Sequence, residues 1–193
     1  HSVYRMLPYA RQLVRLAVCD VLEQEGCLDF VRDGPGGAIL ADVTVYGNPG
    51  RFSIAVRDSS AGTELSVSIT EPRPGLSPEG QRRAENYLAD RVELAAVCDI
   101  NPETARQTAA RFGIPRYYTD AEEMLQKERP DLVSVCTPNA LHKPMTLLAL
   151  SYGAHVACEK PIALTYADAK EMFDYAREKN RVLFACQVLR YNE

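Results

Sequence analysis

From about residue 92 onward, short apolar runs alternate with longer stretches in which apolar residues recur every three or four positions. The short runs are typical of strands that are buried on both faces of a parallel sheet, and the longer stretches are typical of amphipathic helices. We expect strands at 92–100, 116–120, 131–139, 155–161 and 181–191, with helices at 101–114, 120–129, 141–153 and 166–180 between them. Several such units in series predict an α/β fold: a Rossmann-like parallel sheet with helices on both faces.

Small polar residues and glycine mark where these helices should begin and end. Asn101, followed by proline, and Thr165 stand where N-caps are expected, and Gly113 stands where a C-cap is expected. Ser77 and Asp120 have the same position relative to helices predicted at 76–91 and 120–129. The helix boundaries are therefore among the firmest local predictions.

The first ninety residues have a different pattern. Apolar residues in 8–26 have helical spacing, and the runs 37–48, 51–58 and 63–71 alternate as antiparallel hairpins do. A loop rich in proline and glycine follows at 72–80. We expect an α+β leader at 1–63 and a dinucleotide-binding domain at 64–193, with the run 66–70 as a candidate first strand of that domain.

Composition narrows the class of protein. The chain has 193 residues, a net charge of -4 and no basic block, which argues against a nucleic-acid partner. No apolar run is long enough to cross a membrane. The six cysteines form no CxxC pair and there are only three histidines, so we expect no metal site, reduced thiols and a cytoplasmic location.

Four short motifs then occur in a fixed order: "VELAAVCD", "VSVCTPNALH", "GAHVACEKPIALT" and "VLRY". With them, about residues 65–190 resemble the cofactor domain of the Gfo/Idh/MocA family of NAD(P)-dependent oxidoreductases. The resemblance implies hydride transfer to or from a sugar, polyol or related hydroxyl compound. It implies NAD as cofactor, with NADP less favoured, and a small-molecule substrate; association into a homo-oligomer stays open.

The resemblance also assigns roles to particular residues. Lys160 is the catalytic candidate: its ammonium would hydrogen-bond a substrate hydroxyl and stabilise negative charge on that oxygen. Glu159 would position the lysine or the cofactor ribose. The alternative for this pair is a surface ion pair at a strand end, which contributes little.

The remaining candidates are cofactor-binding residues. Asp99 would accept hydrogen bonds from the adenosine ribose and repel a 2′-phosphate, or else cap the following helix. Residues of the second motif would face the nicotinamide, or else form an ordinary turn with a packing histidine. The cofactor-binding set is Gly80, Asp99, Thr137, Pro138, Asn139, His142, Glu159 and Arg190.

The chain departs from the family pattern in two places. The glycine loop expected before residue 81 contains only Gly75 and Gly80, together with prolines and the carboxylates of Glu71 and Glu79, and would bind a pyrophosphate poorly. No acid–base histidine follows Arg190. These features leave three hypotheses: a truncated or rearranged oxidoreductase, a non-catalytic Rossmann-like binding or assembly module, or an unrelated α/β protein.

Overall fold

The computed structural model describes residues 2–7, 9, 11–27 and 29–186. The chain divides into two compact units, His1–Glu93 and Leu94–Glu193. This division falls later in the chain than the predicted boundary between residues 63 and 64. The reason is that the strand formed by 62–72 and the helix after it pack with the leader elements.

Unit 1 is a four-stranded antiparallel sheet with two helices. Its elements are β1 (Val3–Leu7), α1 (Arg11–Gln24), a short 3-10 helix (Pro35–Gly37), β2 (Ile39–Val45), β3 (Asn48–Ser59), β4 (Gly62–Pro72) and α2 (Pro78–Asp90). The strand order is β1-β4-β3-β2. Strand β1 was absent from the sequence prediction, because its five residues, Val3–Leu7, form too short a run to predict a strand without knowledge of its partner β4.

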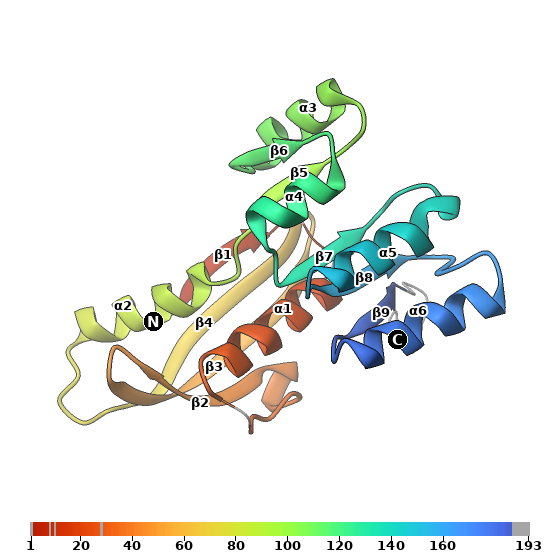
Figure 1. Cartoon of the computed structure of the whole chain (residues 1–193). Coiled ribbons are helices and arrows are strands. Elements are labelled where there is room, and N and C mark those ends of the chain that lie inside the picture. The colour runs from red at the N-terminus through yellow and green to blue at the C-terminus, as the bar shows by residue number, and fades with distance from the viewer. Residues whose placement is uncertain (1, 8, 10, 28, 187–193) are drawn as a thin grey trace. The chain divides into compact units, whose positions relative to one another are not determined.

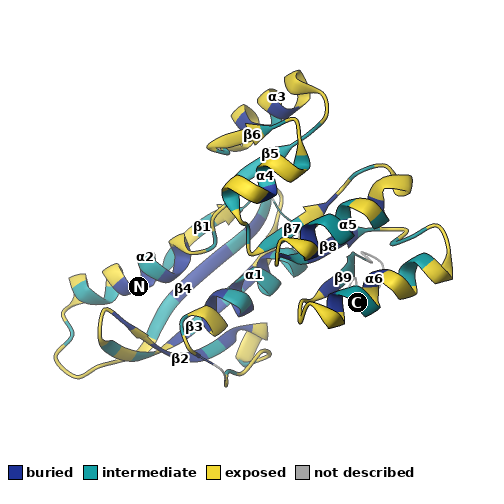
Figure 2. Ribbon diagram, viewed as in Figure 1, coloured by how far each residue is buried: buried dark blue, intermediate teal, exposed yellow. Residues whose placement is uncertain are grey.

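One face of this sheet is apolar and both helices of unit 1 contribute to its core. Phe52, Ile54, Leu65 and Val67 point to the same side and belong to one buried cluster with Leu88 and other residues of α1 and α2. The alternating burial of β2 and β3 (Figure 2) follows from this one-sided packing.

A two-residue turn determines the register of β2 and β3. Tyr46 and Gly47 both have positive φ, 51° and 75°, and join β2 to β3 as a two-residue hairpin. The β3–β4 pairing contains an irregularity between Arg51 and Phe52. The run 66–70, a candidate first strand of the parallel sheet, lies inside β4 and pairs antiparallel with β1 and β3 (Figure 1).

Unit 2 alternates strands and helices, as the sequence predicted. Its elements are β5 (Ala96–Cys98), α3 (Pro102–Phe112), β6 (Arg116–Tyr118), α4 (Ala121–Glu128), β7 (Leu132–Val135), a short 3-10 helix (Asn139–Leu141), α5 (His142–Ser151), β8 (His155–Glu159), α6 (Tyr166–Glu178) and β9 (Leu183–Cys186). All strand pairs are parallel, which confirms the α/β class, but the described strands form two sheets, β5-β6 and β7-β8-β9.

The predicted helix caps are confirmed. Ser77, Asn101, Asp120 and Thr165 each accept a backbone N–H of their helix through the side chain, and Gly113 ends α3 with φ of 64°. Among the described residues, no helix is both long and apolar enough to cross a membrane.

Candidate functional site

Two loops of unit 2 follow the carboxyl ends of neighbouring strands, and we call this end of the sheet the sheet edge. Strand β7 runs into Cys136–Pro138, and β8 runs into Glu159–Pro161. Because β7 and β8 are paired and parallel, their carboxyl ends lie side by side. Ligands of open α/β sheets bind just beyond such ends, so this edge is the candidate site.

His142 links these two loops. Its Nδ1 lies 2.8 Å from the Pro161 carbonyl oxygen, its Nε2 lies 2.8 Å from the Thr137 carbonyl oxygen, and the residue is only 1% exposed. At least one ring N–H donates to a carbonyl in either tautomer. Both ring nitrogens thus face backbone carbonyls, which is the packing role that the sequence left open beside a cofactor contact.

Lys160 follows the last residue of β8 and is exposed. The peptide bond between Lys160 and Pro161 is cis. Among the described residues, neither Glu159 nor Lys160 has an ion-pair partner, so the surface ion pair considered for this sequence is not formed within that part of the chain. The ammonium is therefore available to a ligand at this edge.

The Thr137 hydroxyl is the second unpartnered group here. Its Oγ1 is buried and has no hydrogen-bond partner among the described residues. A buried hydroxyl without a partner is costly, and a ligand that brings a polar atom would remove that cost. Pro138 and Asn139 continue this loop and are exposed. The loop thus fits a polar ligand such as the nicotinamide half of a dinucleotide.

Asp99 follows β5, in the other parallel sheet. Its Oδ1 accepts the Asn101 backbone N–H at 2.8 Å, while Asn101 caps α3 by accepting from Glu103 and Thr104. The capping role therefore belongs to Asn101, and Asp99 orders the turn before it. The second carboxylate oxygen of Asp99 has no hydrogen bond within the described part of the chain and fits a ribose hydroxyl.

The predicted glycine loop lies in unit 1 and does not fit a pyrophosphate. The Gly80 N–H donates to Ser77 Oγ at 3.1 Å, and a Cβ on Gly80 would lie 2.7 Å from Leu76 Cδ1. Helix packing alone thus accounts for this glycine. Glu79 places a carboxylate in the first turn of α2, where a phosphate would need positive potential.

Two of the thiols near the sheet edge, Cys158 and Cys186, are poor nucleophiles. Burial raises the pKa of Cys158, and burial raises the pKa of Cys186 to about 11. All six cysteines are free. Among the described residues there is no group of three or more histidine, cysteine or acidic side chains that could hold a metal ion.

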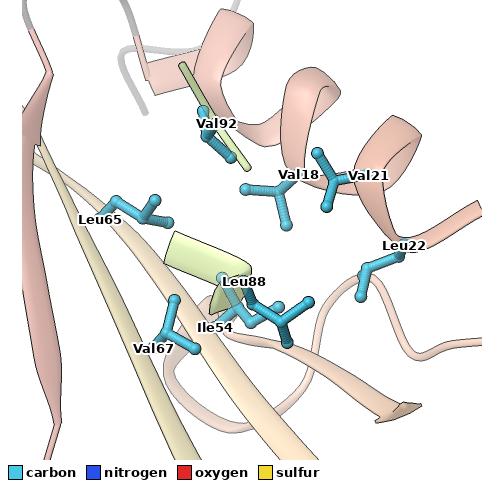
Figure 3. Close-up of a pocket in the computed structure, with 8 residues that line it drawn as sticks. All are labelled: Val18, Val21, Leu22, Ile54, Leu65, Val67, Leu88 and Val92. Carbon is cyan, nitrogen blue, oxygen red and sulfur yellow. The ribbon is translucent and has the colours of Figure 1, made fainter. Parts of the chain in front are cut away.

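Figure 3 shows a pocket that belongs to the core of unit 1. Its eight lining residues are all apolar, among them Val18, Leu65 and Leu88. Because no polar side chain could orient a ligand there, this space is a packing defect. The sheet edge at β7 and β8 therefore remains the candidate site.

The structure thus brings together Thr137, His142 and the Lys160 loop on one sheet. Asp99 lies in a separate sheet and Gly80 in unit 1, without a described contact to that edge. Arg190, with the rest of the fourth motif, lies outside the described residues. The two backbone contacts of His142 could not be foreseen, since no spacing rule predicts which carbonyls a buried ring meets.

Comparison with known proteins gives a family match. Residues 75–187 match the Gfo/Idh/MocA family model, described as an oxidoreductase family with an NAD-binding Rossmann fold. D-glucoside 3-dehydrogenase of Escherichia coli K12 is 46% identical over 92 residues, which are 48% of this chain and 26% of the relative. D-apiose dehydrogenase of Paraburkholderia graminis is 41% identical over 83 residues, 43% of this chain and 22% of the relative.

A solved structure has the same partial overlap. The WlbA dehydrogenase of Bordetella pertussis, in complex with NADH and UDP-GlcNAcA, is 33% identical with a TM-score of 0.51, covering 54% of this chain and 32% of that one. The chain spans about a quarter of the length of the curated relatives it matches.

Proposed function

The chain belongs to the Gfo/Idh/MocA oxidoreductase family, and from that premise we propose that it takes part in NAD(P)-dependent hydride transfer to or from a sugar, polyol or related hydroxyl compound. The observation that carries this proposal is the edge of β7 and β8, where the exposed Lys160 and the unpartnered Thr137 hydroxyl lie on loops joined by His142.

Lys160 is the group that we assign to the substrate oxygen. Oxidation of an alcohol transfers a hydride from carbon to the nicotinamide and releases the proton of the hydroxyl to water, and negative charge builds on that oxygen when the proton leaves ahead of the hydride. An ammonium that donates a hydrogen bond there stabilises this charge. A bound nicotinamide supplies the hydride acceptor. Lys160→Met, which keeps the length of the side chain, should lower kcat about 100-fold or more.

The substrate class follows from the relatives. Several are named as dehydrogenases of sugars or polyols: D-glucoside, D-apiose, levoglucosan and myo-inositol. We propose NAD as the preferred cofactor, because the Asp99 carboxylate would repel a 2′-phosphate. A Bacillus subtilis relative is named as an NADP(+) enzyme, so the preference needs a direct measurement.

Titration of the full chain with NADH, with NADH fluorescence as the signal, tests the cofactor assignment. Asp99→Ala removes an acceptor for the ribose and should weaken binding about tenfold or more. Asp174→Ala on α6 is the matched control, since it removes the same charge from an exposed surface ion pair, and should leave binding unchanged. Equal affinity of all three proteins would contradict the role of Asp99, and no NADH binding by the folded parent chain would favour a non-catalytic binding module.

The free thiols support a reducing, cytoplasmic location. The start of the family domain near residue 64 and the cofactor contact of Arg190 are proposals drawn from the family resemblance, while the compact units of the structure divide later, after Glu93. Size-exclusion chromatography with light scattering would measure whether the chain forms a homo-oligomer.

A further inference from the structure

The helices of unit 1 pack on one face of its sheet. Residues of α1 and α2 share a buried cluster with Phe52, Ile54 and Leu65. Successive side chains of a strand point to opposite faces, so the positions between these residues point to the other face. We call this other face, with Ala55 and Ser66 near its centre, the open face of unit 1. Strands β1 to β4 end at Pro72, before the residues 75–187 that match the family model, so the family match assigns no role to this face.

The centre of the open face carries no charge. Six neighbouring positions form two rows across the sheet and hold apolar or small hydroxyl side chains: Tyr4, Ser66 and Ala55 in one row, and Ser68, Ser53 and Leu40 in the next. Tyr4 is 56% exposed, and Met6 on the same face is 50% exposed. An antiparallel sheet that meets only water normally has a polar outer face. An uncharged centre with exposed apolar side chains is instead typical of the core of a protein–protein interface.

The charges of the open face lie at its two ends. At one end, Arg57 and Glu64 are direct cross-strand neighbours, and neither side chain has a hydrogen bond or ion pair within the described part of the chain. At the other end, Arg51 forms ion pairs with Asp42 at 2.9 Å and with Glu71 at 3.2 Å. A charged rim around an uncharged centre is the usual anatomy of an interface.

The strand order makes the open face complementary to a second copy of itself. In the order β1-β4-β3-β2, the two central strands are β4 and β3. A two-fold axis parallel to the strands and between these two places β3 of each copy over β4 of the other. Each row of residues then lies over the same row of the second copy. Arg57 faces Glu64 of the second copy, and this contact occurs twice because the interface is isologous.

We propose that the open face of unit 1 binds the same face of a second copy of the chain, so that the two form a two-fold symmetric dimer. The small side chains of Ser53, Ala55, Ser66 and Ser68 let the two sheets approach closely, and stacked antiparallel sheets are a common arrangement. This surface lies outside the residues assigned to hydride transfer, so the proposal does not rest on the proposed function.

The size of the face sets the strength that we expect. Four strands with about five residues each cover roughly 19 Å by 17 Å. That is at the low end of specific interfaces, so we expect a reversible dimer with a Kd in the micromolar range, on the order of 10–100 µM.

A partner with charge of one sign fits the open face less well than a second copy does. Both ends of the face carry both signs, with Arg57 beside Glu64 and Arg51 beside Glu71. A nucleic acid or an anionic membrane would meet carboxylates at each end. An identical face, turned by the two-fold axis, offers a carboxylate to each arginine.

The test measures the mass of the full chain by sedimentation velocity between about 1 µM and 1 mM. The parent should shift from monomer to dimer over this range. Arg57→Glu places a carboxylate opposite Glu64 of the second copy at both contacts and should raise the Kd at least about tenfold. Arg83→Glu is the matched control, since it reverses the same charge on the exposed surface of α2, in an ion pair with Glu79, and should dimerise as the parent does.

A mixing experiment tests the two-fold arrangement itself. Glu64→Arg alone should weaken the dimer as Arg57→Glu does, because it places an arginine opposite Arg57 of the second copy. In an equal mixture of the two variants, each reversed charge faces the opposite charge on the other chain, so dimer should return as a heterodimer. Mixing does not change the neighbours within either chain, so an effect of the substitutions on folding cannot produce this return.

Each outcome decides for or against the dimer. A parent chain that stays monomeric at the highest concentration overturns the proposal, as does a dimer that Arg57→Glu leaves unchanged or that mixing fails to restore. Hydrogen exchange of the β4 amides reports whether each variant is folded. If a charge variant does not fold, Ala55→Lys, with Ala55→Ser as its control, takes its place, and only the lysine should abolish the dimer. NADH binding should be equal in the parent and Arg57→Glu, so failure of the dimer leaves the proposed function standing, and the reverse.

Discussion

Replacement of His142 by leucine should destabilise unit 2 and leave unit 1 intact. The imidazole is buried and lies 2.8 Å from the carbonyl oxygens of Thr137 and Pro161. Leucine fills a similar volume but cannot donate, so a carbonyl that now accepts a hydrogen bond loses its donor in a partly buried position. The loops that carry the candidate site would lose the side chain that joins them.

The magnitude follows from the hydrogen-bond inventory. A buried acceptor that is left unpaired costs about 1–3 kcal/mol. The free energy of unfolding of unit 2 should therefore fall by about 1–3 kcal/mol if one carbonyl is affected and by about 2–6 kcal/mol if both are. His142→Gln keeps a donor and should cost less. Lys143→Ala is the neighbouring control, since it breaks only partly exposed ion pairs with Asp168 and Glu171, worth about 1 kcal/mol or less.

Residue-resolved hydrogen exchange is the suitable assay. The chain has no tryptophan, and its tyrosines lie in both units, so intrinsic fluorescence does not separate the two. The opening free energy of the β8 amides should fall by the stated amount, while that of the β4 amides should not change. An equal loss in both units, or no loss in His142→Leu, would refute the reasoning.

Three further predictions concern unit 2. Hydrogen bonds from Arg106 and, to a smaller extent, Gln107 lower the pKa of Glu103 to about 2. The associated stabilisation is present above the ordinary glutamate pKa and is lost as the pH falls through about 2. Carboxyl-detected NMR at pH 3 should therefore show an ionised Glu103 in the parent chain and a protonated Glu103 in Arg106→Ala. Burial raises the pKa of Cys186 to about 11, so iodoacetamide at pH 8 should modify the exposed Cys136 first, as peptide mass spectrometry would show; equal rates would contradict this. Asn101→Ala removes the cap of α3 and should lower its stability by about 1 kcal/mol, measured by exchange of the α3 amides against α6 as reference.

Helix ends and most strands of unit 2 could be predicted from the sequence, because neighbouring residues along the chain determine them. The caps at Ser77, Asn101, Asp120 and Thr165 and the end of α3 at Gly113 were predictable, because each rests on contacts within one helical turn. Strands β6 to β9 were predictable from apolar runs bounded by turn residues. The parallel pairing followed from the alternation of these strands with helices.

Long-range pairing did not follow. The run 66–70 has the same composition whether it pairs in a parallel or an antiparallel sheet, and only its partners β1 and β3 decide between them. The short strand β5 was expected to be buried on the evidence of its apolar residues. All three of its residues are partly exposed, and among the described strands it pairs with β6 only, which its own sequence cannot report.

The candidate site was predictable in part. Lys160 and Thr137 stand out because a charged residue and a polar loop directly follow apolar strands, and the paired strands β7 and β8 place them at one edge. Two other features depend on side-chain positions that the spacing of residues does not encode. They are the contacts of the His142 ring with two backbone carbonyls and the packing of Gly80 against Leu76.

The most direct test of the central claim is the rate of NADH formation from NAD and a panel of sugars and polyols. It compares the parent chain with Lys160→Met. The account predicts turnover by the parent, a fall in kcat of about 100-fold or more in Lys160→Met, and unchanged NADH affinity. Turnover that survives the loss of Lys160, or no turnover by the folded parent chain, would contradict it.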